Sequence, residues 1–373
     1  MGTALLGNHQ RSRSRAFSFA QGLLSRMVFV VMLSPFLFAV GSVGTASASS
    51  ENGQALQIYF VDVEGGQATL FVTPEGKSLL IDTGWPDNNG RDADRIVAAA
   101  KLAGVKQIDF VLLTHYHMDH GGGITQLAAE IPVRGVIDHG ENRELNNDAT
   151  KQVWEDYQKL LEKEKLPRVI AKPGEPLPLE GLETKVISSD GELIEKPLSE
   201  GGGKNTACVS SGKRPADPSE NARSLGVLLT FGKLRILDLG DLTSDKEAQL
   251  VCPLNKLGAV DIYVVSHHGS VTSNSREFLN AIAPRVAIMD NGGSKGGAPS
   301  SWEAVKNSPR LEDFWQLHYA NEGGSDHNVA DSFIANVRGP DAGNYLKLTA
   351  WADGNFDVFN SRTKQTKHYA AAR

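Results

Sequence analysis

The amino-acid sequence predicts an α/β (α+β) fold in which two β-sheets pack face to face and helices cover their outer faces, an αββα sandwich. Short apolar runs typical of strands alternate with helical segments over two successive halves of the chain. Several of these runs end in a carboxylate or an imidazole. Such side chains are expected where strands leave a sheet at one edge, and functional sites are built at such edges.

The first half of the predicted sandwich opens with three successive strands joined by turns that contain glycine, which favours antiparallel pairing. Asp92 comes just before a helical pattern and is placed to cap it. The expected strands cover residues 56–63, 68–73, 78–82, 108–114, 133–138 and 185–188, and the expected helices cover 93–102, 124–129 and 150–165.

The second half repeats the alternation and closes with a hairpin around Asp353 and Gly354. One strand is expected to run into Asp238 and another into the pair His267 and His268. The predicted domain covers 55–362, and the rest is a tail, 363–373. The other expected strands cover 286–290, 314–319, 345–350 and 356–359, with a glycine-rich loop at 291–298 and a helix near 302–307.

Residues 191–221 interrupt the pattern with glycine runs, serines and prolines. This composition cannot bury enough apolar surface to fold by itself, so we expect a flexible surface insertion. The insertion ends next to Asn221. It is expected either to lie over the functional site as a substrate loop or to be an excursion without a role.

The first 48 residues have the pattern of a secretory signal peptide. Four arginines precede the apolar run 27–43, which gives way to the small-x-small motif at 46–48. A permanent membrane anchor is the alternative, but the run contains Pro35 and Gly41 and is short for a span. We therefore expect a cleaved signal, a short linker at 49–54, and a periplasmic or secreted protein without stable membrane association.

Charge argues against a general affinity for nucleic acid. The first 48 residues carry four arginines and no acidic residue, so residues 49–373 hold 34 basic against 44 acidic residues, a formal charge of −10. An acidic chain has no general attraction for polyphosphate. Nucleic acid is thus a possible but disfavoured partner, and a small-molecule substrate is preferred. The sequence does not indicate an oligomeric state.

Cys208 and Cys252 are the only two cysteines in the chain. In an oxidising compartment they can pair and close a loop that stabilises the fold by up to ~4 kcal/mol in the chain-entropy model. Two independent thiols are an equally good interpretation, because Cys208 lies in a polar loop and Cys252 at an expected element end.

Residues 115–120 place four metal-binding side chains directly after the apolar run 110–113, and these are His115, His117, Asp119 and His120. Imidazole and carboxylate are the ligands of zinc and of similar divalent ions. One intervening residue lets the rings of His115 and His117 converge where the backbone leaves a strand and turns. The glycine run 121–123 fits such a turn.

The order of these residues resembles the metallo-beta-lactamase-fold hydrolases, whose hallmark is His-x-His-x-Asp-His followed by a later Asp and a later His. Here the cluster is followed by Asp241 and by the pair His267 and His268. Segments 60–68, 221–225 and 267–270 are similar to the hydrolase domain of ComEC-type competence proteins. The resemblance covers about residues 55 to 360. It implies the metallo-beta-lactamase αββα sandwich and a centre of one or two divalent ions.

The resemblance also implies a role for each ligand. His115 and His117 would hold a first ion, and Asp119 and His120 a second. Asp241 would bridge the two ions, and His268 would complete the second, with His267 behind it as an orienting neighbour. The order of these two adjacent imidazoles remains open at this point.

One departure from the family pattern concerns the first ion. Most members supply a third histidine between the cluster and the bridging aspartate, but no histidine occurs here between His139 and His267. The carbonyl oxygen of Asn221, the hydroxyl of Ser224 or water would have to take that place. An oxygen ligand favours a harder ion, so manganese competes with zinc, and either a weak first ion or a single-ion enzyme follows.

Two further residues are candidates for the catalytic machinery beside Asp119. Asp82 is expected to accept a hydrogen bond from a ligand imidazole and fix its tautomer, although an aspartate before Thr-Gly also suits a turn. His318 ends a late strand and could donate to a developing oxyanion, or it could be an ordinary structural histidine. Asp238 is expected to be structural.

The sequence therefore favours a secreted hydrolase that uses a metal-activated hydroxide on an ester, phosphoester or amide. One alternative is an extracytoplasmic nuclease of the ComEC type. Another is a non-catalytic binding protein with a relic metal site, but metal ligands buried without a metal are costly, which disfavours it.

Overall fold

The computed structural model describes residues 55–86, 88–208 and 214–372 of the chain. The expected signal peptide and linker lie outside these residues. None of the helices in the described part has the length and apolar character needed to cross a bilayer.

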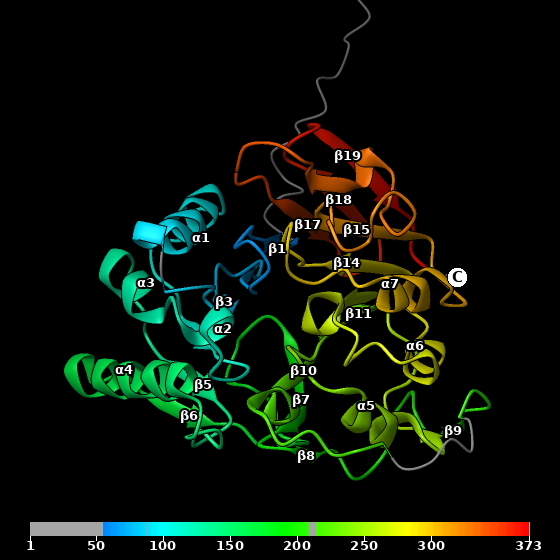
Figure 1. Ribbon diagram of the computed structural model, residues 1–373, viewed down its shortest axis with the longest axis horizontal. Helices are drawn as coiled ribbons and strands as arrows, with labels where there is room; N and C mark the ends of the chain where they lie inside the picture. Colours follow the sequence, from blue (N-terminus) through cyan, green and yellow to red (C-terminus); the bar gives the residue numbers. More distant parts are fainter. Residues whose placement is uncertain (1–54, 87, 209–213, 373) are drawn as a thin grey trace, which may run out of the picture. The chain divides into compact units, whose positions relative to one another are not determined.

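Two large sheets form the centre of the domain (Figure 1). The chain enters the first sheet through the antiparallel strands β1 to β3, as the sequence predicts. It continues through the parallel strands β4 to β6. In spatial order the first sheet contains β19 (Gln365–Tyr369), β18 (Phe356–Asn360), β17 (Leu346–Ala350), β1 (Leu56–Phe60), β2 (Thr69–Val72), β3 (Ser78–Ile81), β4 (Phe110–Leu112), β5 (Val136–Asp138) and β6 (Arg168–Ile170).

The second sheet is mixed in the same way, with parallel pairing from β11 to β16 and antiparallel pairing at its other end. Its order is β16 (Ile334–Asn336), β15 (Asp313–His318), β14 (Val286–Met289), β13 (Ile262–Val264), β11 (Leu234–Asp238), β10 (Gly226–Phe231), β7 (Glu183–Ser189) and β8 (Glu192–Leu193). A separate pair consists of β9 (Gly203–Lys204) and β12 (Leu254–Asn255).

Helices flank both sheets, so the αββα sandwich is confirmed (Figure 1). The first sheet is covered by α1 (Arg91–Leu102), α3 (Ile124–Glu130) and α4 (Asp148–Glu164), and the second by α5 (Ser244–Val251), α6 (Arg276–Ile282) and α7 (Pro299–Lys306). The short helices are α2 (Met118–Gly121), η2 (Asn88–Gly90), η3 (Glu220–Arg223), η4 (Ser266–Gly269) and η5 (Asp331–Phe333).

Side-chain alternation along β1 produces the layers. Leu56, Ile58 and Phe60 join the core between the sheets, whereas Tyr59 packs in the core beneath the helices of the first sheet. Successive side chains of a strand point to opposite faces, and both faces of this strand are buried. The opening strand therefore has an apolar residue at almost every position.

Three sequence-based expectations about local structure differ from the structure. Helix α1 begins after Gly90, at φ 81°, and Asp92 lies inside the first turn, where its carboxylate accepts from the backbone N–H of Trp85 at 2.9 Å. Residues 363–373 are not a plain tail, because they include β19, which pairs with β18. Strand β6 was not expected, since a run of three residues carries too little pattern.

The insertion at 191–221 is attached to the second half of the domain at several points. It contributes β8 to the edge of the second sheet and β9 to the pair with β12. Cys208 forms a disulfide with Cys252, just after α5, which decides between the two interpretations of the cysteines.

Candidate metal centre

The loop after β4 carries the first set of ligands. The chain leaves the sheet at Leu112, and α2 begins directly after His117, so Asp119 and His120 lie in its single turn. The glycines after it serve close packing. A Cβ on Gly122 would lie 2.2 Å from the carbonyl oxygen of Met118, and one on Gly123 would lie 2.2 Å from that of Thr83. Both glycines have ordinary helical dihedrals, so the turn itself does not need them.

The second sheet supplies the remaining ligands from the loops after two neighbouring strands. Asp241 follows β11, and η4 follows β13 with His267 and His268 in the left-handed region at φ 56° and 53°. Two consecutive non-glycine residues in this region cost free energy, and such strain is concentrated at functional sites. The backbone N–H of Leu225 donates to the carbonyl of Thr114 at 2.8 Å and joins the two sheets beside the site.

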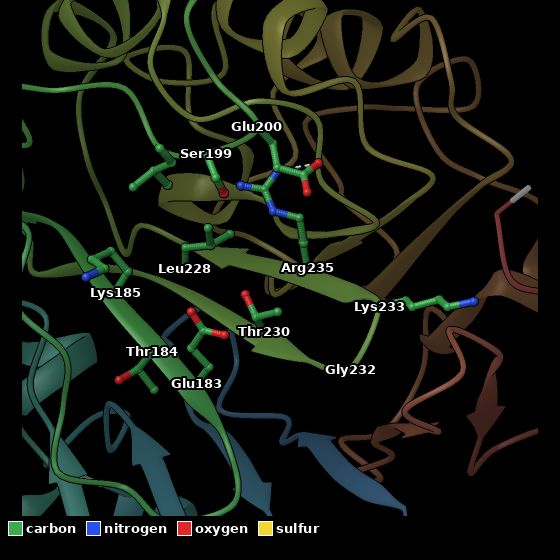
Figure 2. A pocket seen from close by; sticks show the side chains of 11 residues that line it. Glu183, Thr184, Lys185, Ser199, Glu200, Leu228, Thr230, Gly232, Lys233 and Arg235 are labelled. Carbon is green, nitrogen blue, oxygen red and sulfur yellow. Dashed lines mark ion pairs between the residues drawn. The ribbon is translucent and has the colours of Figure 1, made fainter.

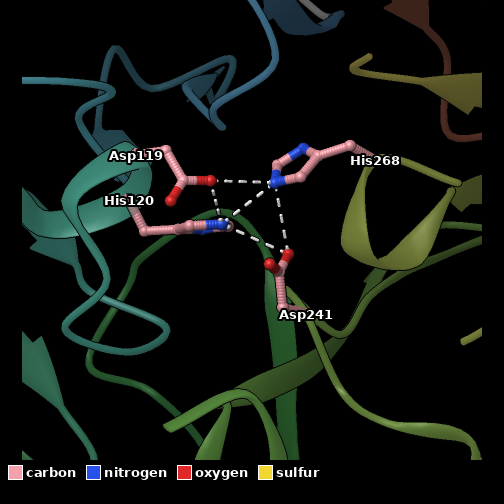
Figure 3. A group of neighbouring side chains, drawn as sticks. All are labelled: Asp119, His120, Asp241 and His268. Atoms are coloured by element: carbon pink, nitrogen blue, oxygen red, sulfur yellow. Dashed lines mark hydrogen bonds and ion pairs between the residues drawn. The ribbon is translucent and has the colours of Figure 1, made fainter. Parts of the chain in front are cut away.

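Four of these side chains form a closed set, called here the Asp119 group: Asp119, His120, Asp241 and His268 (Figure 3). Their ligand atoms all lie within 4.8 Å of one another, and all four residues are buried. Asp119 Oδ2 lies 3.2 Å from the Nε2 atoms of both His120 and His268. Asp241 Oδ1 lies 3.2 Å and 3.4 Å from the same two nitrogens.

The donor set of the Asp119 group fits a divalent cation. Asp241 Oδ1 is buried and has no hydrogen-bond partner, which is costly for a carboxylate oxygen unless something positive sits against it. Two imidazole nitrogens and two carboxylates converging on one point are the ligands used by zinc and related ions.

The other ring nitrogen of each candidate ligand faces a side chain that can orient it. His120 Nδ1 lies 2.6 Å from Asp82 Oδ2, and His268 Nδ1 lies 3.3 Å from Asp290 Oδ1 in a less aligned ion-pair contact. Metal-binding histidines commonly donate their second N–H in this manner, which fixes the tautomer. Asp82 thus has the contact expected for it from the sequence, and it also accepts from the hydroxyl of Thr114 at 2.6 Å.

Three more imidazoles, His115, His117 and His267, lie on the other side of Asp241 and are called here the His115 group. His115 Nε2 lies 3.1 Å from His117 Nδ1 and 3.9 Å from Asp241 Oδ2. His267 Nε2 lies 3.4 Å from the same carboxylate oxygen. Asp241 therefore faces one group with each oxygen, although the His115 group does not form a closed set among the described residues.

The His115 group also has orienting contacts on its outer nitrogens. His115 Nδ1 lies 3.0 Å from Thr114 Oγ1, and His117 Nε2 lies 3.1 Å from Glu144 Oε2. His267 Nδ1 lies 2.9 Å from Thr272 Oγ1. His267 was expected to lie behind His268, but its Nε2 faces Asp241, on the side where this chain lacks the third histidine of the family pattern.

Asn221 and Ser224, the residues expected to replace the missing third histidine, do not both face the first ion position. Ser224 Oγ accepts from the backbone N–H of Asp241 at 3.2 Å, so it supports the bridging residue. Asn221 places Nδ2 3.4 Å from His267 Nε2, and its Oδ1 is buried without a partner. Asn221 thus adjoins the His115 group.

Electrostatics differ between the groups. Burial is the largest influence on Asp119 and Asp241 and raises the pKa, but the nearby imidazoles outweigh it, so the pKa of each carboxyl lies well below its usual value. Burial likewise opposes protonation of His120 and His268, yet the carboxylates raise the pKa of both imidazoles well above the ordinary value. In the His115 group, burial lowers the pKa of His115 and of His267.

His318 lies apart from the Asp119 group. Its Nε2 is 2.6 Å from Asp62 Oδ1 and 3.9 Å from Glu64 Oε1. Asp62 also accepts from Arg95 at 3.0 Å, so this cluster is already paired in charge. The ring nitrogen that was expected to donate to an oxyanion is thus occupied by Asp62.

Several contacts had no sequence signal. Lys295 pairs with Asp119, Glu144 Oε2 lies 3.1 Å from His117 Nε2, and Asp290 Oδ1 lies 3.3 Å from His268 Nδ1. A charged residue in a polar loop looks the same in sequence whether it faces solvent or a site. Asp238 is structural, as expected: it accepts from Gln67 Nε2 at 2.7 Å.

A separate hollow of about 540 Å³ lies over β7, β10 and β11 (Figure 2). Its lining residues include Lys185, Thr230 and Arg235, and none of the lining residues belongs to the Asp119 or His115 group. Arg235 donates to the carbonyl of Leu257 at 2.7 Å. This hollow is therefore unrelated to the metal centre.

An αββα sandwich whose two sheets both contribute histidine and aspartate to one buried point defines a class of metal-dependent hydrolase folds. Residues 61–203 match the family model described as the metallo-beta-lactamase superfamily, and the chain carries a domain of that superfamily.

Two curated relatives are similar over most of the domain. Recombination protein 2 of Haemophilus influenzae is 26% identical over 237 residues, covering 63% of this chain and 24% of that protein. Competence protein ComA of Neisseria gonorrhoeae is 25% identical over 268 residues, covering 70% of this chain and 30% of that protein. The matched region is thus less than a third of either relative's length.

Among solved structures, a Cronobacter sakazakii metallo-beta-lactamase with a HARLDQ motif is similar, with 18% identity and a TM-score of 0.32. The match covers 50% of this chain and 60% of the Cronobacter chain.

Proposed function

We propose that this chain is a secreted metal-dependent hydrolase acting on an ester, phosphoester or amide. The observation that carries the proposal is the Asp119 group, in which a buried carboxylate oxygen of Asp241 lacks a partner among converging imidazoles. One or two divalent ions, zinc or manganese, would satisfy that oxygen.

The protein's own residues would divide the work. A divalent ion bound here would polarise a substrate oxygen and lower the pKa of a water molecule. Asp119, His120 and His268 would hold it on one side of Asp241, and the His115 group would hold a second ion on the other. Asp82 would keep the Nδ1 proton of His120 in place, so that Nε2 stays free to ligate.

Export is part of the proposal. It is supported by the arginine-led apolar run and small-x-small motif of the first 48 residues, and separately by the disulfide between Cys208 and Cys252. Disulfides persist in oxidising compartments. Protein from the native host should begin near Ser49 and be found in the periplasm or medium; an intact Met1 on protein from the cytoplasm would defeat this part.

The reaction is tested with a substrate panel. It contains a chromogenic lactam, an ester, a phosphomonoester, a bis-aryl phosphodiester and single-stranded DNA, each with zinc and with manganese. We expect turnover of a small ester or phosphodiester that disappears in Asp119→Ala. The matched control is Asp156→Ala, an exposed carboxylate on α4 that hydrogen-bonds Gln152 at 2.8 Å. Equal turnover in Asp119→Ala and the wild type would remove the metal centre from the mechanism.

A second candidate, an extracytoplasmic nuclease, is supported by the similarity to a recombination protein and a competence protein. The net acidic charge of residues 49–373 disfavours it, since long DNA is bound through several lysine or arginine contacts. Rapid cleavage of the DNA with no turnover of small substrates would reverse our ranking.

A further inference from the structure

Lys295 is the cation that the fold places on the Asp119 group. Its Nζ pairs with Asp119 Oδ2, the same oxygen that faces His120 and His268. Among the lysines and arginines of the described residues, only Lys295 forms an ion pair with a carboxylate of this group. Among the described residues, Lys295 is therefore the lysine or arginine that places a positive charge beside these ligands.

The backbone around Lys295 is fixed to the site. The loop is tied to a ligand residue, because the N–H of Gly297 donates to the carbonyl of His268 at 2.8 Å. Within the loop, the N–H of Gly292 donates to the carbonyl of Lys295 at 2.8 Å. On the opposite side Gly65 packs so closely that a Cβ there would lie 2.9 Å from Lys295 Cβ. The side chain thus starts from a defined point at the metal centre.

The end of the Lys295 side chain is open to solvent. The side chain is 35% exposed, against 8% for that of Asp119, and Nζ lies 5.0 Å from the centroid of the Trp85 ring. The ammonium group therefore lies between the buried ligands and the solvent. A molecule that approaches the Asp119 group from solvent would meet it.

Metal binding changes what Lys295 can pair with. A divalent ion held by Asp119 Oδ2 takes over the charge that now pairs with the ammonium group, and the two cations repel one another. An ammonium group in a partly desolvated position is best satisfied by another anion. In the metal-loaded protein, a substrate bound at the ion could supply that anion.

We propose that Lys295 binds an anionic oxygen of the substrate at the metal centre, so that the preferred substrates carry a negative charge at the scissile group, as a phosphodiester does. This inference rests on the proposed hydrolase function. Lys295 gives a net acidic protein a local positive charge at the one place where an anionic ester must be held.

The competing explanation is that Lys295 is only a structural counter-charge for Asp119. The two differ in the effect of removing the charge. If Lys295 is only a counter-charge for Asp119, it competes with the metal ion and does not bind substrate. If Lys295 binds substrate, it still binds an anion after the metal ion is in place.

The experiment compares Lys295→Gln and Lys295→Arg with the wild type. Lys159→Gln is the matched control, a lysine on α4 whose side chain is 68% exposed. Metal content is measured by elemental analysis, and binding of inorganic phosphate to the manganese-loaded protein by calorimetry. The kcat/KM of bis-p-nitrophenyl phosphate is compared with that of the neutral ester p-nitrophenyl acetate.

Lys295→Gln should retain its metal, bind phosphate about tenfold more weakly, and shift the ratio of the two kcat/KM values about tenfold towards the neutral ester. Lys295→Arg should recover most of the phosphate binding, and Lys159→Gln should match the wild type. Unchanged phosphate binding in Lys295→Gln, no phosphate binding by the loaded wild type, or loss of metal from Lys295→Gln would overturn the inference. A wild type that binds no metal would instead refute the proposed function.

Discussion

The Asp119 group and the His115 group share Asp241 but differ in how closely their side chains converge. In the Asp119 group every ligand atom lies within 4.8 Å of every other. The His115 group and Asp241 form no such closed set among the described residues, although single contacts in it are short: His115 Nε2 lies 3.1 Å from His117 Nδ1 and 3.9 Å from Asp241 Oδ2. A metal-binding sequence motif therefore does not make its two ion positions equal.

Protonation sharpens the contrast. The carboxylates raise the pKa of His120 and His268 against the effect of burial. In the His115 group burial lowers the pKa of His115 and of His267 instead. We infer a tight position at the Asp119 group, because its four ligand atoms converge, and a weaker position beside it.

The largest expected effect is at the tight position. His268→Ala should lower metal affinity by more than about 100-fold, because partners that only orient a ligand already contribute 10–100-fold. Elemental analysis should then find little metal after gel filtration. His117→Ala is the paired variant, and it should keep one ion per chain. Equal losses in the two variants would show that the groups do not differ.

The next effect should come from the orienting carboxylate of the Asp119 group. Asp82→Asn can donate an N–H towards His120 Nδ1, which favours the wrong tautomer, so metal affinity should fall roughly 10–100-fold. Competition with a chromogenic chelator measures it. Asp109→Asn serves as a control, since that carboxylate accepts from the backbone N–H of Ser78 at 2.9 Å, away from the ligands. A wild-type affinity in Asp82→Asn would mean that the hydrogen bond is incidental.

A smaller effect should separate His267 from His268. His267→Ala should weaken only the second of two metal-binding steps, by about tenfold, because one of several ligands of an open position is lost. Titration with manganese and with zinc resolves the two steps. If His267 merely supports His268, the first step should weaken instead.

The smallest effect concerns a buried carboxyl outside both groups. Burial raises the pKa of Glu247 to about 7, although the N–H groups of Asn274 and Ser275 donate to it and lower the pKa. Because this value lies above the unfolded value of 4.5, the stability that the group contributes is complete below pH 4.5 and is lost as the pH rises through 7. The carboxylates of the Asp119 group shift in the opposite direction.

Glu247→Gln removes this titration. The decline in the free energy of unfolding between pH 4.5 and 7 should become shallower by on the order of 3 kcal/mol. Urea unfolding at several pH values gives the slope, which is independent of any uniform loss of stability in the variant. The same slope in both proteins would contradict the assignment.

Many ligands of the Asp119 and His115 groups could be predicted from the sequence. Those in 115–120 are neighbours in the chain, and their spacing fits one turn after a strand. Asp241 and His268 could be placed by the family pattern. The separate directions of His267 and His268 could not, since they depend on left-handed backbone dihedrals that histidines seldom adopt. Neither could the pairing of His318 with Asp62, which lie 256 residues apart.

The elements of the fold could likewise be predicted where they carry a local sequence pattern, and not where they depend on distant contacts. Most strands with strong apolar character were located to within a few residues, but β10 was missed although nearly all of its residues are buried. The short strands β6, β8, β9, β12 and β16 and the terminal strand β19 were missed as well. β6 is only three residues long, and four of the five residues of β19 are exposed, so that the strand depends on pairing with β18. The partner of Lys295 was also out of reach, because opposite charges far apart in sequence give no local pattern.

The Asp119 group draws two ligands from each half of the sandwich, so an ion bound there would hold the two halves together. His120 and His268 are separated by 148 residues, so an ion bound to both closes a very long loop. Because the ion binds only when both halves of the sandwich are in place, its binding free energy adds to the stability of the folded state. The supply of metal would then set how long the chain stays folded.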